Sequence, residues 1–256
     1  MTLRLEVDGP IARLLIDRSE KRNSFNQAMW EQLPALLGQA MADPQVHVLV
    51  VQAAEAGAFS AGADITEFSG HAQDKAWRDA NQAAIRRAQH ELARAEKPTI
   101  ALVEGVCVGG GCGLAIACDL RVAGPLARFG ITPARLGLVY SLHDTKLLVE
   151  LVGPAQAKRI LFTGDLIDAA EAARIGLVDI LANDAAATAG ELAASIAAAS
   201  PHSARASKKI IRRILDGQVE DDPDTIAQFN QAFDGEDYRE GVAAFLEKRR
   251  PSFRSR

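Results

Sequence analysis

Apolar and polar residues alternate in the first part of the chain and later give way to longer amphipathic stretches. Residues 3–7 and 11–17 alternate on either side of a short Gly-Pro turn, which predicts a β-hairpin. Residues 46–52 and 99–103 are continuous apolar runs of strand length, as expected for strands covered on both faces. Shorter strands are predicted at 120–123 and 177–181.

Helical periodicity and capping residues predict the remaining elements. Asn26 can cap a helix over 27–41, and Asp168 can cap another that stops at Gly176. Residues 129–140 are rich in turn residues and predict an irregular segment. From residue 184 onward only helices are predicted. The chain therefore divides into an α/β core, residues 1–195, and a helical tail, residues 196–256. The other predicted helices are 74–94, 142–152, 154–162, a stretch ending at 200, 204–215 and two between 225 and 248.

Composition narrows the class of protein. The chain has 256 residues, 48% of them hydrophobic, and a net charge of -4, which argues against a nucleic-acid binder. It has no apolar run of about 18 residues, so no membrane span is expected, and the charged N-terminus does not suggest a signal peptide. The three cysteines are spaced five and six residues apart, which fits neither a disulfide framework nor a zinc site. They predict buried, reduced thiols in a cytoplasmic protein without a metal.

A glycine-rich turn follows the apolar strand at 99–103. Gly109, Gly110 and Gly111 let the backbone turn sharply into a small-residue helix over 114–118. The start of a helix presents unpaired N–H groups and the positive end of its dipole. The N–H near Gly110 can therefore hold a developing oxyanion, although a tight turn without a ligand fits the same residues.

Two other loops carry polar chemistry. Residues 57–62 have the Gly-x4-Gly spacing of a phosphate-binding loop, but Ala63 and Asp64 stand where Lys and Ser/Thr are required, so nucleotide hydrolysis is not expected. Ser60 is not in the Gly-x-Ser-x-Gly elbow of a serine hydrolase. The polar loop at 18–24 carries Lys21 and Arg22, which suit either a solvated turn or a clamp for phosphate groups.

Taken together, two of these segments resemble the paired signatures of the crotonase superfamily, the enoyl-CoA hydratase/isomerase family. They are Phe-Ser-Ala-Gly-Ala-Asp-Ile at 59–65 and Glu-Gly-Val-Cys-Val-Gly-Gly-Gly-Cys-Gly at 104–113. Segments 18–23, 129–133, 136–137, 161–165 and 236–250 match as well, so the resemblance covers essentially the whole chain. It implies a crotonase-like spiral of ββα units, a C-terminal helical region used for trimerisation, and a homotrimer or dimer of trimers. It also implies an acyl-CoA thioester substrate, of which coenzyme A is a part, and no separate cofactor.

The resemblance assigns the site residue by residue. The thioester carbonyl oxygen is expected between the peptide N–H groups of Ala63 and Gly110, which favour the enolate. The residues that match substrate- and CoA-binding positions are Lys21, Arg22, Ser24, Ala61, Asp64, Ile65, Gly109 and Pro133.

The chain departs from the family in its acid–base groups. Hydratases of this family use two glutamates, where this chain has Gly113 and either Pro133 or Ala134. Standard hydration and the one-glutamate isomerase mechanism are therefore not expected. Segment 131–142 more closely resembles the methylmalonyl-CoA decarboxylase branch, in which residues matching Thr132 and Tyr140 face the acyl group. That branch has His at position 63 and Glu at position 113, so the match is incomplete.

Three functional hypotheses follow. The first is decarboxylation of a short carboxyacyl-CoA, which makes the enolate without a base while Tyr140 and Thr132 hold the carboxylate. The second is an enoyl-CoA hydratase or isomerase that uses Asp144, His143 or an ordered water as its acid–base group. His143 and Asp144 are adjacent in sequence and are not expected to form a pair on one helix face. The third is a non-catalytic acyl-CoA-binding subunit.

Overall fold

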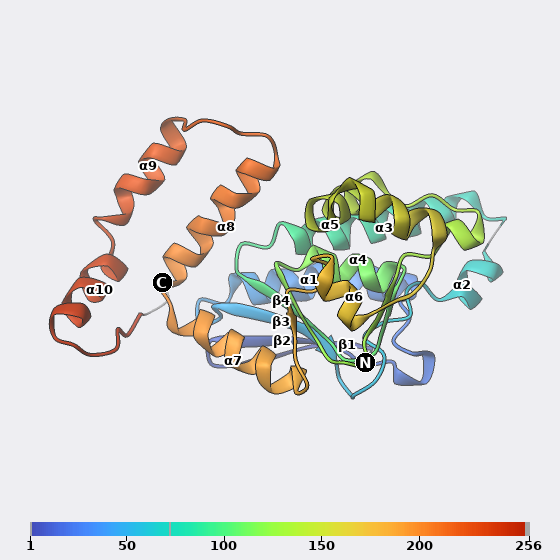
Figure 1. Ribbon diagram of the computed structural model, residues 1–256, viewed down its shortest axis with the longest axis horizontal. Coiled ribbons are helices and arrows are strands. Elements are labelled where there is room, and N and C mark those ends of the chain that lie inside the picture. Colours follow the sequence, from blue (N-terminus) through green and yellow to red (C-terminus); the bar gives the residue numbers. More distant parts are fainter. Residues whose placement is uncertain (1, 72, 254–256) are drawn as a thin grey trace.

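The computed structural model describes residues 2–71 and 73–253, which fold around one main sheet (Figure 1). β1 and β2 form the antiparallel hairpin that the alternating pattern predicts. From β2 onward, neighbouring strands run parallel in the order β1-β2-β3-β4-β6-β9. The strands are β1 (Leu3–Asp8), β2 (Ile11–Ile16), β3 (Val48–Ala53), β4 (Thr99–Val103), β6 (Leu120–Ala123) and β9 (Ile180–Leu181).

The central strands are covered on both faces, as their continuous apolar runs predict. Leu49 and Val51 of β3 belong to a large core cluster, whereas Val48 and Val50 belong to a second one that contains alanines of α7 (Ala185–Ala198). In Figure 1, α7 lies below the sheet and the other core helices lie above it. These helices are α1 (Gln27–Ala42), α3 (Lys75–Ala93), α4 (Gly110–Ala117), α5 (Leu142–Thr163) and α6 (Ala169–Arg174).

The connections determine where the helices begin. α1 follows β2, α2 (Ile65–Gly70) and α3 follow β3, and α4 follows β4 and the short strand β5 (Val106–Val108), each connection leading back to the next parallel strand. The N-termini of these helices therefore lie toward the edge of the sheet at which the parallel strands end, which is where ligands bind in open α/β sheets. Asn26 caps α1 as predicted, since its side chain accepts a hydrogen bond from the Met29 N–H at 3.0 Å.

Two local predictions need correction. Residues 129–140 are not wholly irregular, because β7 (Arg128–Gly130) pairs with β5 (Val106–Val108) and β8 (Ile167–Asp168) in a small second sheet. The predicted strand at 177–181 shortens to β9. The N–H groups of Leu177 and Val178 donate to the Ala172 carbonyl at 2.9 and 3.1 Å, closing the turn after α6 instead of pairing with a strand.

The predicted break between two helices at 142–152 and 154–162 is confirmed. α5 is interrupted at Gly153, whose φ of 72° and ψ of 165° are not helical, and Pro154 begins the second part. The positive φ favours glycine here because a Cβ is strained in that conformation.

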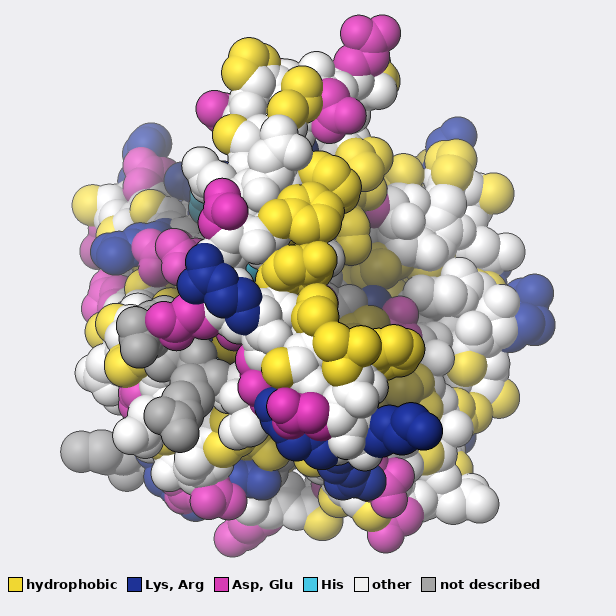
Figure 2. Space-filling view, turned by 90° about the vertical axis from the view of Figure 1, so that its left-hand side faces the viewer, with side chains coloured by type: hydrophobic (Ala, Val, Ile, Leu, Met, Phe, Trp, Pro, Cys, Tyr) yellow, Lys and Arg dark blue, Asp and Glu magenta, His cyan; other side chains and the backbone are white. Residues whose placement is uncertain are grey.

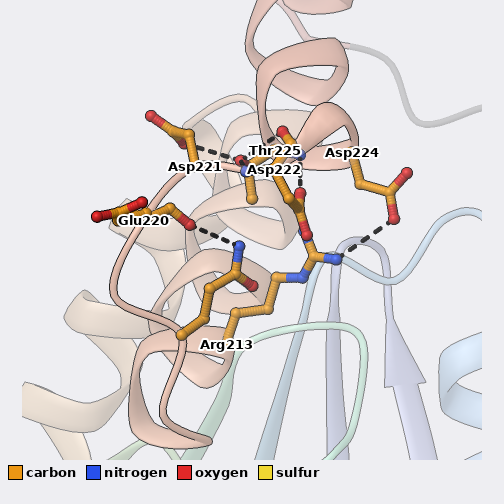
Figure 3. Close-up of polar contacts among 7 residues, drawn as sticks. Arg213, Glu220, Asp221, Asp222, Asp224 and Thr225 are labelled. Carbon is orange, nitrogen blue, oxygen red and sulfur yellow. Dashed lines mark hydrogen bonds and ion pairs between the residues drawn. The ribbon is translucent and has the colours of Figure 1, made fainter.

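The C-terminal helices stand beside the core (Figure 1). They are α8 (Pro201–Leu215), α9 (Pro223–Ala232) and α10 (Glu236–Leu246). Their turn is ordered by Arg213, which bonds Asp222 at 3.1 Å and Asp224 at 3.4 Å, while Asp222 and Thr225 cap α9 reciprocally (Figure 3). Because α7 packs on the sheet, it belongs to the core, and the helical tail begins after it, close to the predicted boundary at 195. The division of the chain into two domains stays a prediction.

The tail exposes an apolar face. Figure 2 shows a continuous hydrophobic stripe over this side of the molecule. Phe229, Phe233 and Tyr238 form a chain of edge-to-face ring contacts, and Phe245 is 83% exposed. A contiguous exposed apolar surface of this kind is typical of an interaction site.

The three cysteines are described, and all are buried and free of disulfide bonds. Burial raises the pKa of the Cys118 thiol to about 12, so this group stays protonated. Among the described residues, no helix combines the length and apolarity required to cross a bilayer.

Candidate active site

The glycine-rich loops at 57–64 and 105–111 lie against each other. The Ser60 N–H donates to the Val106 carbonyl at 3.0 Å, and the Val108 N–H donates to the Ser60 carbonyl at 2.9 Å. Gly62 has a φ of +92°, and a Cβ there would lie 2.7 Å from the Val108 carbonyl oxygen and 3.3 Å from the Gly110 nitrogen. Only glycine allows this approach, which brings residue 63 next to residue 110.

Two peptide N–H groups at this junction are unused. In residues 2–71 and 73–253, neither the Ala63 N–H nor the Gly110 N–H donates a hydrogen bond, although Asp64 and Gly109 beside them do, at 2.9 and 2.8 Å. A Cβ on Gly110 would lie 3.9 Å from the Ala63 nitrogen, so the two groups are neighbours. Gly110 also opens α4, where the helix dipole is positive. The pair can bind one oxygen that carries negative charge.

The ring of Trp30 lies behind this pair. A Cβ on Gly110 would meet the Trp30 ring at 3.0 Å. Trp30 is 1% exposed, and its Nε1 has no partner among the described residues. Asn81 on α3 is equally buried, and both of its amide atoms lack a described partner as well. Polar groups buried in this way are rare in native proteins, and they indicate a ligand or ordered water.

Gly113 lies one turn further along α4, and other elements fill the space beside it. A Cβ at this position would overlap the terminal amide of Gln89 from α3, and it would lie 3.1 Å from the Tyr140 hydroxyl. The Tyr140 hydroxyl is buried and has no partner in the described part of the chain. Burial and, to a smaller extent, the nearby Asp144 charge raise the pKa of Tyr140, so its hydroxyl stays protonated and can donate.

Gln89 links this space to Asp144. The amide nitrogen of Gln89 faces Asp144, and it donates to the two carboxylate oxygens at 3.0 and 3.1 Å. An amide oxygen in that place would face only acceptors. Asp144 is 3% exposed, and burial raises its pKa to about 6, against the opposing effect of the Ser141 hydroxyl. Ser141 caps α5 by accepting from the Asp144 N–H at 3.0 Å.

His143 points elsewhere. Its ring lies 5.5 Å from the ring of His90 on α3, and its Nε2 has no partner among the described residues. Burial and the neighbouring His90 lower the pKa of His143. His143 and Asp144 thus contact different groups on α3.

Thr132 and Pro133 follow β7, which runs past the glycine turn. The Gly109 N–H donates to the Gly130 carbonyl at 2.8 Å, which holds this segment beside the start of α4. Thr132 is half-buried, and its hydroxyl makes no hydrogen bond with the described residues. Pro133 begins a short 3-10 turn, Pro133–Leu136.

The loop at 18–24 is tied to the loop at 58–64. The Asn23 amide donates to the Ala58 carbonyl at 2.6 Å, and the Ala61 N–H donates to the Arg22 carbonyl at 2.9 Å. Lys21 and Arg22 are exposed on this joined surface, and neither has a carboxylate partner in the described residues. Two unpaired cations beside the free amides suit a ligand with phosphate groups.

Arg18 joins the same two loops through its contacts with Ser24 and Asp64. Arg18 bonds the Asp64 carboxylate at 2.8 Å and the Ser24 carbonyl at 2.9 Å. Burial would raise the pKa of Asp64, but the Arg18 hydrogen bond and charge outweigh it, and the pKa is lowered. Asp64 also caps α2 (Ile65–Gly70) through the Thr66 N–H, whereas Ile65 is 59% exposed. The carboxylate of Asp64 is therefore occupied within the protein.

The sequence predicted most of these residues but not Gln89. The helical period of α3 places residue 89 beside Ala88 and Leu92 on the buried face. A glutamine among apolar core positions is the signal that would have indicated it. Asn81 and Trp30 give similar signals.

A large groove of about 1050 Å³ lies away from this site. It separates α8 from the core and is lined by Ile116–Leu120 and by residues of α8. It therefore lies at the C-terminal end of α4, whereas the free amides lie at the N-terminal end.

Known proteins share this fold and are similar in sequence over nearly the whole chain. The model of the family "Enoyl-CoA hydratase/isomerase" matches residues 6–256. An enoyl-CoA hydratase/isomerase family protein from Hyphomonas neptunium superposes with a TM-score of 0.97 at 41% identity, covering 100% of this chain and 98% of that one. A short-chain-enoyl-CoA hydratase of Clostridium acetobutylicum is 33% identical over 96% of this chain and 95% of its own. A crotonyl-CoA hydratase of Syntrophomonas wolfei is 33% identical over 98% and 97%.

The fold is therefore the crotonase fold, an α/β architecture with a C-terminal helical region, as predicted. The chain belongs to the enoyl-CoA hydratase/isomerase family, whose enzymes act on acyl-CoA thioesters.

Proposed function

We propose that this protein binds an acyl-CoA thioester with its carbonyl oxygen between the N–H groups of Ala63 and Gly110. The two peptide groups are neighbours and have no acceptor in the described chain. Charge on that oxygen increases when the thioester becomes an enolate, so the donors favour the enolate over the substrate. One such donor contributes about 2.7–4 kcal/mol to catalysis in comparable sites.

We further propose decarboxylation of a short carboxyacyl-CoA. The observation that carries it is the buried Tyr140 hydroxyl, which has no partner among the described residues and lies beside Gly113, one helical turn after Gly110. The hydroxyls of Tyr140 and Thr132 donate to the substrate carboxylate and hold it out of the thioester plane. The bond between the α-carbon and the carboxylate breaks, CO2 leaves, and the electron pair passes into the enolate. No base is required for this step.

The missing glutamates fit this reaction. A carboxylate at position 113 would stand beside the substrate carboxylate, and two charges 4 Å apart repel by about 4 kcal/mol at an effective dielectric of 20. Neutral Tyr140 and Thr132 avoid this cost.

The coenzyme A portion would lie over the joined loops at 18–24 and 58–64. Lys21 and Arg22 supply positive charge for its phosphates, and Ser24, Ala61, Asp64 and Ile65 shape the surface. Gly109 and Pro133 border the acyl end. In this proposal coenzyme A enters and leaves as part of substrate and product, and the chemistry uses no further cofactor.

A second candidate is an enoyl-CoA hydratase or isomerase with a non-standard acid–base group. Asp144 favours it, because a buried carboxyl with a pKa of about 6 can exchange a proton near neutral pH. Relatives named as hydratases also favour it. His143 is the weaker alternative, since its ring faces His90 on α3. A chain that binds acyl-CoA without turnover is the third candidate.

Self-association through the tail is part of the proposal. The exposed apolar stripe on α8 to α10 supports burial against further copies of the chain, in a homotrimer or a dimer of trimers (Figure 2).

A mass-resolved turnover screen tests these candidates. It uses crotonyl-CoA, a 3-enoyl-CoA, malonyl-CoA, methylmalonyl-CoA and ethylmalonyl-CoA, with Tyr140→Phe alongside. Decarboxylation predicts the loss of CO2 from a carboxyacyl-CoA and a decrease of at least tenfold in kcat for Tyr140→Phe, because a neutral donor to a charged group is lost. Hydration of crotonyl-CoA that survives this substitution rejects decarboxylation and favours Asp144. Binding of acyl-CoA without any turnover favours the third candidate.

A further inference from the structure

The free N–H groups of Ala63 and Gly110 each belong to a peptide unit whose carbonyl is already bonded. The Gly62 carbonyl, in the same unit as the Ala63 N–H, accepts from the Phe25 N–H at 2.7 Å. The Gly109 carbonyl, in the same unit as the Gly110 N–H, accepts the first hydrogen bond inside α4 at 3.0 Å. In a planar trans peptide the N–H points away from its own carbonyl. Phe25 therefore directs the first donor, and the first turn of α4 directs the second.

The side chains of Phe25 and Trp30 connect these two peptide units. Phe25 precedes the Asn26 cap of α1, and Trp30 lies in the first turn of that helix. Apolar residues at these two positions pack together and fix the angle at which a chain enters a helix. Their ring centroids are 4.4 Å apart, and both side chains are 1% exposed.

The six-membered ring of Trp30 reaches the start of α4. A Cβ on Gly110 would lie 3.0 Å from its Cζ2 and 3.4 Å from its Cη2, so the ring packs directly against the glycine. The same Cβ would lie 3.9 Å from the Ala63 nitrogen. One aromatic pair thus contacts both halves of the proposed oxyanion site.

We propose that Trp30 is a positioning residue for the two N–H groups. Through Phe25 it is connected to the peptide unit of Ala63, and through its six-membered ring it supports the start of α4 at Gly110. The ring thereby sets the separation of the two donors, which must both lie about 2.7–3.1 Å from the oxygen that they bind. This inference rests on the proposed acyl-CoA site, and it adds what holds the two donors in place.

A change in this contact should affect an enolate more than the rest of a bound ligand. Hydrogen bonds to the thioester oxygen strengthen as negative charge develops on it. The coenzyme A portion, in the proposed site, contacts the loops at 18–24 and 58–64 instead. Misaligned donors therefore lower the stabilisation of the enolate and leave the affinity for coenzyme A unchanged. A residue that only supports the fold would weaken stability and both kinds of binding together.

Acetoacetyl-CoA measures enolate stabilisation without requiring turnover. The carbon between its two carbonyl groups loses a proton to solvent, and the electron pair passes into the enolate, which absorbs in the near ultraviolet. The ratio of bound enolate to bound keto form can therefore be measured at one fixed pH. Coenzyme A without an acyl group provides the matched measurement of affinity, and urea denaturation gives the stability of each variant.

Three variants isolate the contact. Trp30→Phe keeps a ring against Phe25 but lacks the second ring that carries Cζ2 and Cη2. It should lower the enolate ratio about tenfold, less than the 10²–10³-fold typical of removing a donor. Gly110→Ala forces the added Cβ and the Trp30 ring apart by a few tenths of an ångström and should lower the ratio about fivefold. The double variant should stabilise the enolate better than either single variant, because the added methyl group occupies the space that the indole vacates.

Trp77→Phe is the matched control. It makes the same chemical change on α3, where the Trp77 ring stacks on His71 with centroids 4.7 Å apart. The enolate ratio should stay at the wild-type value in this variant, and the affinity for coenzyme A should stay unchanged in all four.

Several outcomes overturn the inference. An unchanged ratio in Trp30→Phe rejects it, and so do losses in Trp30→Phe and Gly110→Ala that simply multiply in the double variant. A loss of coenzyme A affinity equal to the loss of enolate rejects it as well. If Trp30→Phe does not fold, Phe25→Leu replaces it, since it keeps the main-chain bond to Gly62 and lets the Trp30 ring move away from the added Cβ. Absence of recovery in Phe25→Leu with Gly110→Ala then rejects the inference.

The proposed site fails separately. A wild-type protein that does not bind acetoacetyl-CoA, or binds it without raising the enolate fraction above that in solution, has no working oxyanion pair, and the inference falls with it. A wild-type protein that stabilises the enolate while the variants show no recovery retains the proposed site and rejects only the role of Trp30.

Discussion

The polar groups at the two ends of α4 differ in whether they have hydrogen-bond partners. Beyond its C-terminus, the Asp119 carboxylate accepts from the Thr99 N–H at 2.7 Å and pairs with Lys208 at 2.7 Å. Arg121, only 1% exposed, donates to the carbonyls of Leu177 and Cys118 and pairs with Asp179 at 2.6 Å. At the N-terminus, the Gly110 N–H and the Tyr140 hydroxyl have no partner among the described residues.

This difference separates stability from function within one short helix. A buried polar group without a partner costs free energy, and most native groups therefore have one. The satisfied end joins β4, β6 and the turn after α6 into one core. The unsatisfied end retains a cost that a ligand or ordered water can remove. Substitutions at the satisfied, C-terminal end of α4 should change the stability of the fold. Substitutions at the unsatisfied, N-terminal end, called the open end below, should change activity.

The largest expected effect is on stability at the satisfied end. Arg121→Met removes a buried guanidinium, leaves the carbonyls of Leu177 and Cys118 without its donors and leaves Asp179 only the backbone N–H of residue 121, which should lower the free energy of unfolding by about 3–5 kcal/mol. Urea denaturation measures it. Lys75→Met removes an exposed pair with Asp79 and should change stability by less than about 0.5 kcal/mol. A similar small change for Arg121→Met would contradict the contrast between the two ends.

At the open end, Gly110→Pro should abolish the donor while preserving the helix. Proline is tolerated at the first position of a helix, where its missing N–H has no helical partner. Turnover of the acyl-CoA identified in the screen should fall by about 10²–10³-fold. Gly110→Ala is the matched control, because it places the same Cβ 3.0 Å from Trp30 but retains the N–H. Equal losses in both variants would assign the effect to the Cβ.

The buried carboxyl of Asp144, near the N-terminal end of α4, should also have a measurable effect on stability. The pKa of Asp144 is about 6 in the folded protein, against an ordinary value of 3.8. Between these values the folded state binds the proton more tightly, so the free energy of unfolding falls as pH rises from about 4 to about 6. The difference between the two pKa values corresponds to about 3 kcal/mol.

Asp144→Asn should therefore be more stable than wild type by about 2–3 kcal/mol at pH 7.5 and nearly equal to it at pH 4. Urea denaturation at the two pH values checks this. A stability difference that is the same at both would mean that Asp144 does not titrate in this range.

Local signals in the sequence predicted much of the fold. The β-hairpin, the Asn26 cap and the break at Gly153 depend on neighbouring residues, and all three are confirmed. The small sheet of β5, β7 and β8 was missed, because strands of two or three residues have no period to detect. The shortening of the strand at 177–181 depends on Ala172, whose carbonyl competes for the strand's amides.

The candidate site divides in the same way. The glycine-rich turn indicated Gly110, because consecutive residues set the backbone conformation there, and the family resemblance indicated Ala63. Gln89 lies 55 positions before Asp144, and only the packing of α3 against α4 and α5 brings it to Gly113. No local pattern in the chain contains that contact.

The contacts of Arg18 with Ser24 and Asp64, which join the loops at 18–24 and 58–64, affect the rates at which a ligand binds and leaves. Loops that are already joined by an ion pair and several hydrogen bonds have little conformational entropy left to lose when a ligand arrives. Encounter should then resemble docking onto a rigid surface, with association rates similar for all acyl-CoA ligands. Acyl-CoA ligands would then differ mainly in their dissociation rates. The coenzyme A portion, which they share, contacts the loops at 18–24 and 58–64, whereas the acyl group, which differs, contacts other residues.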